Sequence, residues 1–176
     1  MRTEYLLDRE VERVLGALTP SNRLALRVSL HTGLRIGDVL ALRTADLKPQ
    51  FWITESKTGK AKMVGLPVDL LDDLKDNAGE VWVFPHRLDP QKHRTRQAVW
   101  ADVKRAQKAF RLPQNIGPHS FRKAYAVHLF ERYGNIEKVR RALNHSNTEV
   151  TMIYAMADHL MRQPCRRKTR RRSTRS

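Results

Sequence analysis

The chain has 176 residues, 40% of them hydrophobic and 30% charged, which suits one domain with a sizeable core rather than two. It contains no apolar run of about 18 residues, no secretory signal at its N-terminus and a single cysteine, Cys165, so the sequence predicts a reducing, cytoplasmic setting without membrane spans or intrachain disulfides. The formal net charge of +16 predicts a polyanionic partner, which is nucleic acid or less often an anionic membrane.

Helical periodicity is the first pattern along the chain. Apolar residues recur at helical spacing in residues 8–18 and again in residues 20–32, which predicts two helices. Pro20 suits the first position of the second helix, and Gly33 is expected to end it. A third, short helix is predicted for residues 36–43.

The pattern then changes to one typical of strands. Residues 51–56 and 61–66 are β-prone runs on either side of a turn, Lys57–Lys60, that contains a glycine. This arrangement predicts an antiparallel hairpin. Residues 68–77 are predicted to be helical, and residues 81–84 to form another short strand.

The C-terminal half is predicted to be helical. The first helix covers residues 96–111, and its expected apolar anchors are Val99, Trp100, Val103 and Phe110. Three further helices are expected at residues 118–132, 135–143 and 148–157, with Ser146 or Asn147 as the cap of the last one. The expected fold class is therefore mainly α with a small antiparallel β-sheet (α+β).

The C-terminus has a different composition. From Arg162 to the end the chain carries eight Lys or Arg residues and no acid, which is half of the net charge. Such a segment cannot bury a core and is expected to stay disordered until it meets a polyanion. We therefore expect a catalytic domain at residues 1–160 and a basic tail at residues 161–176.

Several common catalytic motifs are absent from the sequence. There is no Cys/His cluster at zinc spacing, no Walker-type glycine loop and no G-x-S-x-G, and the carboxylates are scattered. We therefore expect chemistry on nucleic acid that uses neither a metal nor another cofactor.

Six residues beside predicted turns or helix ends have side chains suited to a phosphodiester. They are Arg35, Lys57, His119, Arg122, His145 and Tyr154. Arginine forks stabilise charge on non-bridging phosphate oxygens, and a phenol becomes a nucleophile when cations lower its pKa. A lysine can protonate the leaving 5′ oxygen, and histidines can donate to the phosphate or accept the phenolic proton. Taken singly, each residue also has an ordinary explanation in surface charge, a turn or core packing, so the prediction depends on the joint pattern.

The same residues lie in four segments that resemble the tyrosine recombinases of the phage-integrase type. TGLRIGDVLAL at 32–42 is similar to the family's first arginine box, and SKTGK at 56–60 is similar to the hairpin with its catalytic lysine. PHSFR at 118–122 is similar to the His-x-x-Arg box, and LNHS at 143–146, with Thr151 and Tyr154, to the box that holds the last histidine and the nucleophile. The order and the spacing both agree, and the resemblance covers roughly residues 5–156.

The resemblance implies a role for each residue. Arg35 and Arg122 would clamp the scissile phosphate, Lys57 would be the general acid, and His119 would assist proton transfer at the tyrosine. His145 would hydrogen-bond the phosphate, Tyr154 would form a 3′-phosphotyrosine link, and Asp38 would support the site. The tail residues expected to bind DNA are Arg166, Arg167, Lys168, Arg170, Arg171 and Arg172.

The sequence departs from the family pattern at three places. Asn144 replaces the usual glycine of the last box, although asparagine tolerates a left-handed backbone, and Lys123 replaces a frequent histidine. Most members also carry a helical DNA-binding domain of roughly 100 residues ahead of the catalytic fold, which here begins almost at Met1. The chain could be a minimal enzyme, a shortened one, or half of a system completed by a partner protein.

Three functions are compatible with the pattern. The first is a site-specific recombinase that cleaves and rejoins double-stranded DNA during integration or excision, as a homotetramer on paired sites in a bacterial or phage-infected cell. The second is a DNA-binding protein that has kept the fold without turnover. The third is a nicking-closing enzyme of the type IB topoisomerase kind, although those enzymes usually have lysine at the first position of the His-x-x-Arg box.

Overall fold

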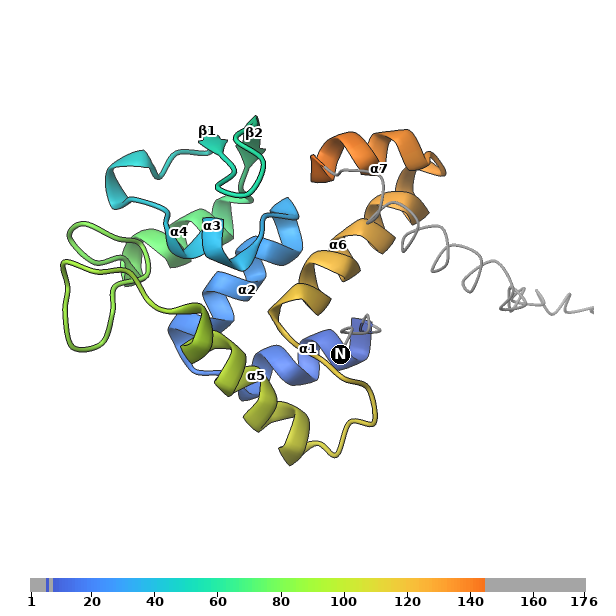
Figure 1. The fold of residues 1–176 in the computed structure, drawn as a ribbon, viewed down its shortest axis with the longest axis horizontal. Coiled ribbons are helices and arrows are strands. Elements are labelled where there is room, and N and C mark those ends of the chain that lie inside the picture. The colour runs from blue at the N-terminus through green and yellow to red at the C-terminus, as the bar shows by residue number, and fades with distance from the viewer. Residues whose placement is uncertain (1–5, 7, 145–176) are drawn as a thin grey trace, which may run out of the picture.

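The computed structural model describes residues 6 and 8–144, and within them it is mainly helical with one two-stranded antiparallel sheet (Figure 1). The elements in chain order are α1 (Asp8–Ala17), α2 (Pro20–Thr32), α3 (Ile36–Leu40), the 3₁₀ turn η1 (Thr44–Asp46), β1 (Gln50–Thr54), β2 (Ala61–Gly65), α4 (Val68–Asn77), α5 (Arg96–Ala109), α6 (Pro118–Tyr133) and α7 (Ile136–Leu143). The expected α+β class is confirmed. The helix predicted at residues 148–157 and the basic tail lie outside the described residues.

Helix α2 is the centre of the fold. Helices α1, α3, α4 and α6 pack against it (Figure 1), and Ala25, Leu26 and Val28 of α2 are fully buried. Burial on several faces follows from its sequence, in which apolar residues occupy more than one helical stripe. In the described part of the chain, no helix is both long enough and apolar enough to span a membrane.

A tight turn joins α2 to α3 and determines where Arg35 lies. Gly33 adopts a left-handed conformation with φ +68°, and its N–H donates to Ser29 O at 2.8 Å, as the sequence predicts for the end of this helix. The Ser29 hydroxyl donates to Leu34 O at 2.8 Å. Arg35 follows directly as the residue that precedes the first turn of α3.

Gly33→Ala should destabilise the protein strongly. A Cβ at this position would lie 2.5 Å from the Tyr125 ring and 3.0 Å from Leu143. We expect about 1–2 kcal/mol from the left-handed backbone and about 1–3 kcal/mol more from overpacking, measured by urea denaturation. Gly134→Ala is the matched control, because Gly134 also has a positive φ (+59°) but no atom within 4 Å of its Cβ position. Equal losses of stability in the two variants would contradict the overpacking argument.

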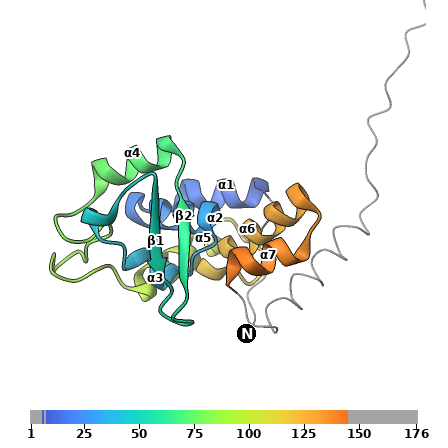
Figure 2. The same ribbon diagram turned by 90° about the horizontal axis from the view of Figure 1, so that it is seen from above.

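The hairpin forms where the sequence predicts it. Strand β1 pairs with β2 in a register that runs from Gln50 opposite Gly65 to Thr54 opposite Ala61. The turn between them is closed by Glu55, whose N–H donates to Lys60 O at 3.0 Å and whose carbonyl accepts from Gly59 N at 2.9 Å. Figure 2 shows the two strands side by side. The turn that carries Lys57 is therefore anchored by backbone bonds.

Two predicted elements differ in the structure, and one contact between segments explains both. The helix predicted at residues 36–43 ends at Leu40, and residues 81–84 form no strand of the sheet. Instead, Arg43 and Trp82 form an isolated antiparallel bridge, with Val83 N donating to Leu42 O at 3.0 Å. This long-range pairing extends the backbone after Leu40, and it is too short to make a strand.

Helix α5 is held against the start of α2 by a buried carboxylate. Asp102 accepts from the Thr19 N–H at 2.9 Å and from Asn22 Nδ2 at 2.7 Å. Burial acts to raise the pKa of Asp102, but the hydrogen bonds from Asn22, Thr19 and Arg105 outweigh it and hold that pKa below its ordinary value. These bonds fix α5, which also packs against α3.

The prediction that Trp100 is an apolar anchor of α5 was wrong. Val99 and Val103 are buried as expected, whereas Trp100 is 53% exposed. Its ring lies on the outer face of the helix, where the Lys104 ammonium is 5.8 Å from the ring centroid. Helical periodicity alone does not distinguish an apolar residue at the edge of the buried stripe from one inside it.

Candidate active site

One cavity brings together residues from four separate segments of the chain. It has a volume of about 320 Å³, and its lining residues are Arg35, Ile36, Gly37, Ser56, Lys57, Arg96, Pro118, His119 and Arg122. The first three come from the start of α3, the next two from the hairpin turn, one from the start of α5 and the last three from the start of α6. Four of the six predicted residues therefore share one cationic cavity.

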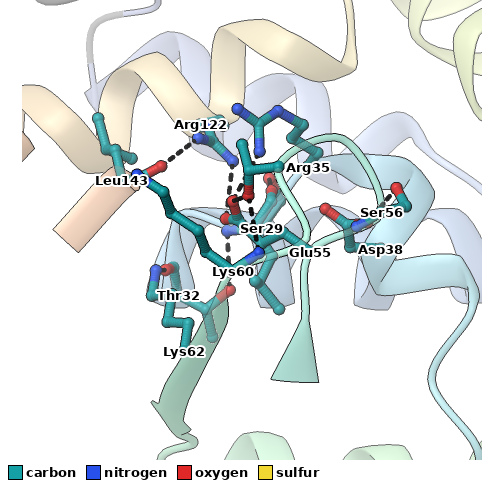
Figure 3. A network of polar contacts seen from close by, with 12 residues as sticks. Ser29, Thr32, Arg35, Asp38, Glu55, Ser56, Lys60, Lys62, Arg122 and Leu143 are labelled. Carbon is teal, nitrogen blue, oxygen red and sulfur yellow. Dashed lines mark hydrogen bonds and ion pairs between the residues drawn. The ribbon is translucent and has the colours of Figure 1, made fainter. Parts of the chain in front are cut away.

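The hairpin turn is fixed to α3 by Asp38. This aspartate is buried, and its Oδ1 accepts from the Ser56 N–H at 3.0 Å and from the Ser56 hydroxyl at 2.6 Å. Ser56 directly precedes Lys57, which is exposed at the cavity. Figure 3 shows this contact between Asp38 and Ser56. It gives Asp38 a physical means of holding Lys57 at the cavity that the two arginines line.

A buried glutamate lies between the two arginines. Glu55 Oε2 accepts from Arg35 Nη1 at 2.8 Å, and Glu55 Oε1 is 3.7 Å from Arg122 Nη1. Figure 3 shows the two guanidiniums converging on this carboxylate. Burying charged groups is unfavourable unless they are paired, and this carboxylate offsets part of the positive charge of the site.

Arg122 also connects the cavity to the end of α7. Its Nη2 donates to Leu143 O at 2.7 Å. The next residue, Asn144, has a left-handed conformation with φ 50° and ψ 39°, which confirms that asparagine supports the turn in place of glycine. His145 and Tyr154 follow this turn and lie outside the described residues, as do Arg166, Arg167, Lys168, Arg170, Arg171 and Arg172.

Lys62 and Tyr125 lie close to the arginines. The Lys62 ammonium donates to Thr32 O at 2.6 Å and is 5.7 Å from the centroid of the Tyr125 ring. Burial, followed by the nearby charge of Arg122, lowers the pKa of Lys62 to about 8. Burial also disfavours the charged form of Tyr125, a phenolate, and therefore raises the pKa of that residue. Both shifts favour the neutral forms of these two partly buried side chains.

Two residues of the site were not predicted from the sequence. Glu55 follows Phe51 and Ile53 on the inward face of the first strand, and this period of two could have revealed a carboxylate that points into the core. Arg96 has no comparable signal, because only tertiary packing brings the start of α5 beside the other segments. Arg96 also lines a second hollow of about 410 Å³, together with Ile36, Gln97, Trp100, Gly117, Pro118 and His119.

Within residues 6 and 8–144, no group of three or more His, Cys, Asp or Glu side chains is arranged to hold a metal ion.

Comparisons with known proteins point to one family. The model of the phage integrase family matches residues 4–160. A tyrosine recombinase of Thermosipho africanus is 30% identical over 162 residues, which cover 86% of this chain and 56% of that protein. The chain spans about half the length of several curated relatives it matches, with 56%, 43% and 49% of three of them covered.

Solved structures have the same fold. The catalytic domain of bacteriophage HP1 integrase matches with a TM-score of 0.62 at 23% identity, over 93% of this chain and 97% of that one. A lambda integrase tetramer bound to a Holliday junction matches with a TM-score of 0.67 at 23% identity, over 87% of this chain and 48% of that one.

Proposed function

The chain belongs to the phage integrase family, and from this premise we propose that it is a site-specific recombinase. In this proposal it cleaves and rejoins double-stranded DNA, in a bacterial or phage-infected cell, through a 3′-phosphotyrosine bond. The observation that carries the proposal is the cavity in which Arg35, Arg122, Lys57 and His119 converge. Two guanidiniums, an ammonium and an imidazole form a set of donors that matches a phosphodiester undergoing substitution.

Each residue then has one task. Arg35 and Arg122 bind the non-bridging oxygens of the scissile phosphate, and their forks stabilise the charge that develops there. Tyr154 attacks phosphorus with its phenolic oxygen, and the bond to the 5′ oxygen breaks. Lys57 protonates that leaving oxygen, His119 assists the transfer of the phenolic proton, and His145 donates to the phosphate. Asp38 holds the turn of Lys57 through Ser56.

Rejoining is the reverse of this step. A 5′-hydroxyl attacks the phosphotyrosine, the tyrosine leaves, and the DNA backbone is restored. The energy of the original phosphodiester stays in the protein–DNA ester, so sealing needs no ATP.

We further propose that exchange between two DNA molecules takes place in a tetramer of this chain on paired sites. The solved lambda integrase tetramer on a Holliday junction supports this stoichiometry by analogy of fold. A partner protein that supplies a second DNA-binding domain is part of the same hypothesis. Full activity of the purified chain alone on DNA would contradict the need for such a partner.

Covalent trapping tests the function directly. The purified chain is mixed, in a buffer that contains EDTA, with nicked suicide duplexes. A supercoiled plasmid that carries the genomic DNA flanking the gene is the alternative substrate. We expect a protein–DNA adduct that survives denaturation and EDTA. DNA binding without an adduct would favour a non-catalytic DNA-binding protein, whereas relaxation of the plasmid without exchange between sites would favour a nicking-closing enzyme.

The arginine-rich tail is proposed to add sequence-independent contacts with phosphate. Eight Lys or Arg residues lie between Arg162 and the C-terminus. Each phosphate contact releases counterions, so the slope of log K against log salt should become shallower by about 0.9 per lost contact. Deleting residues 162–176 should therefore weaken binding and reduce this slope by several units in fluorescence anisotropy titrations. An unchanged slope would contradict the role of the tail.

A further inference from the structure

Glu55 is a fully buried carboxylate beside a cavity that is otherwise cationic. Its side chain is 0% exposed, and it contacts Arg35 Nη1 at 2.8 Å and Arg122 Nη1 at 3.7 Å. Both arginines line the cavity, whereas Glu55 does not. The two guanidiniums that face this carboxylate (Figure 3) therefore also border the space that a phosphate would occupy.

The same residue organises the turn that carries Lys57. Glu55 Oε2 accepts from the Thr58 hydroxyl at 3.1 Å, and the Glu55 N–H donates to Lys60 O at 3.0 Å. These bonds bracket Lys57 on its C-terminal side, while the contacts of Ser56 with Asp38 fix its N-terminal side. One glutamate thus connects segments that supply three of the four cationic groups of the cavity.

The charge balance requires an acid at this place. Arg35, Arg122 and Lys62 bring three cationic groups close to Glu55, and its charge is one of those that influence Lys62. Guanidiniums without a fixed acceptor can adopt other rotamers, and their forks are useful only when both N–H groups point at the ligand. A neutral amide of the same shape offers one acceptor oxygen, and its NH₂ group would face an N–H donor.

We propose that Glu55 is a positioning residue for strand cleavage. Its carboxylate orients Arg35 and Arg122 from behind, so that their outer N–H groups receive the scissile phosphate, and it holds the turn that presents Lys57. The inference rests on the proposed DNA cleavage for its kinetic consequence, whereas the orientation of the arginines can be measured without cleavage.

The kinetic test compares Glu55→Gln with Glu137→Gln. Both variants lose one negative charge and keep the side-chain shape, and Glu137 pairs with Arg140 at 2.9 Å on the surface of α7. Single-turnover cleavage and DNA affinity are measured separately. We expect Glu55→Gln to cleave about 10–100-fold more slowly than Glu137→Gln, with equal or tighter DNA binding, because a negative charge has been removed near the phosphate. Cleavage rates within threefold of each other, or an affinity that falls in step with the rate, would overturn the proposal.

The second measurement is the NMR spectrum of ¹⁵N-arginine side chains, assigned with Arg35→Lys and Arg122→Lys. In Glu55→Gln we expect the Nε–Hε signals of Arg35 and Arg122 to shift, and their Hε protons to exchange faster with water. Both signals should stay unchanged in Glu137→Gln. Unchanged signals in folded Glu55→Gln would refute the positioning role, even if the wild type cleaves DNA. Changed signals in a protein that forms no adduct would support the positioning role and refute the proposed function. If Glu55→Gln does not fold, the double variant with Lys62→Gln, which removes one neighbouring cation, replaces it in both measurements with the same expected results.

Discussion

A Tyr154→Phe variant should form no covalent adduct with DNA and should still bind DNA as tightly as the wild type. Phenylalanine has the ring of tyrosine without the oxygen that attacks phosphorus in the proposed mechanism, so the loss of adduct should be complete in the trapping assay. Binding depends on cations that the substitution does not touch. Residual adduct in Tyr154→Phe would show that another residue is the nucleophile.

Tyr125 provides the matched control. It lies close to the arginines, but burial, followed by the proximity of Tyr133, raises its pKa and disfavours the phenolate that attack requires. Tyr133, the other tyrosine of the described residues, is 45% exposed near the end of α6, with the Lys138 ammonium 4.7 Å from its ring centroid. Tyr125→Phe should therefore keep the adduct, and its loss there would argue against Tyr154.

The sequence predicts those parts of the fold that depend on local chemistry. Gly33 ends α2 because a left-handed residue is needed there, and Asn144 meets the same need at the end of α7. The hairpin follows from two β-prone runs around a turn with glycine at positive φ. In each case a short segment determines its own conformation.

The parts that were missed depend on contacts between distant segments. The bridge between Arg43 and Trp82 ends α3 early, and the sequence of residues 36–43 alone does not predict this bridge. Arg96 enters the cavity only because α5 is held by Asp102 against the start of α2. Four of the predicted site residues nevertheless converge, because motifs that each lie beside a turn or a helix end are brought to one place by the packing of α2, α3 and α6.

Arg122→Lys should slow strand cleavage by about 10²–10³-fold, which is the usual cost of removing one preorganised donor from a transition state. The guanidinium of Arg122 is 2% exposed, donates to Leu143 O and faces Glu55. A lysine has a single nitrogen, so it cannot bond the Leu143 carbonyl and the glutamate while it also presents a fork to the phosphate. Single-turnover rates on the suicide duplex would measure this loss.

The same substitution should also loosen the end of α7. A buried carbonyl that loses its donor costs about 1–3 kcal/mol, and Leu143 directly precedes the Asn144 turn that leads to His145 and Tyr154. Hydrogen exchange of the α7 amides should therefore become faster in Arg122→Lys. Arg35→Lys makes the same chemical change but leaves the bond between Arg122 and Leu143 in place, so it should slow cleavage without altering exchange in α7. If both variants left α7 equally protected, Arg122 would act on the phosphate alone. If only Arg122→Lys exposed α7, one arginine would both bind the phosphate and secure the segment that delivers the nucleophile.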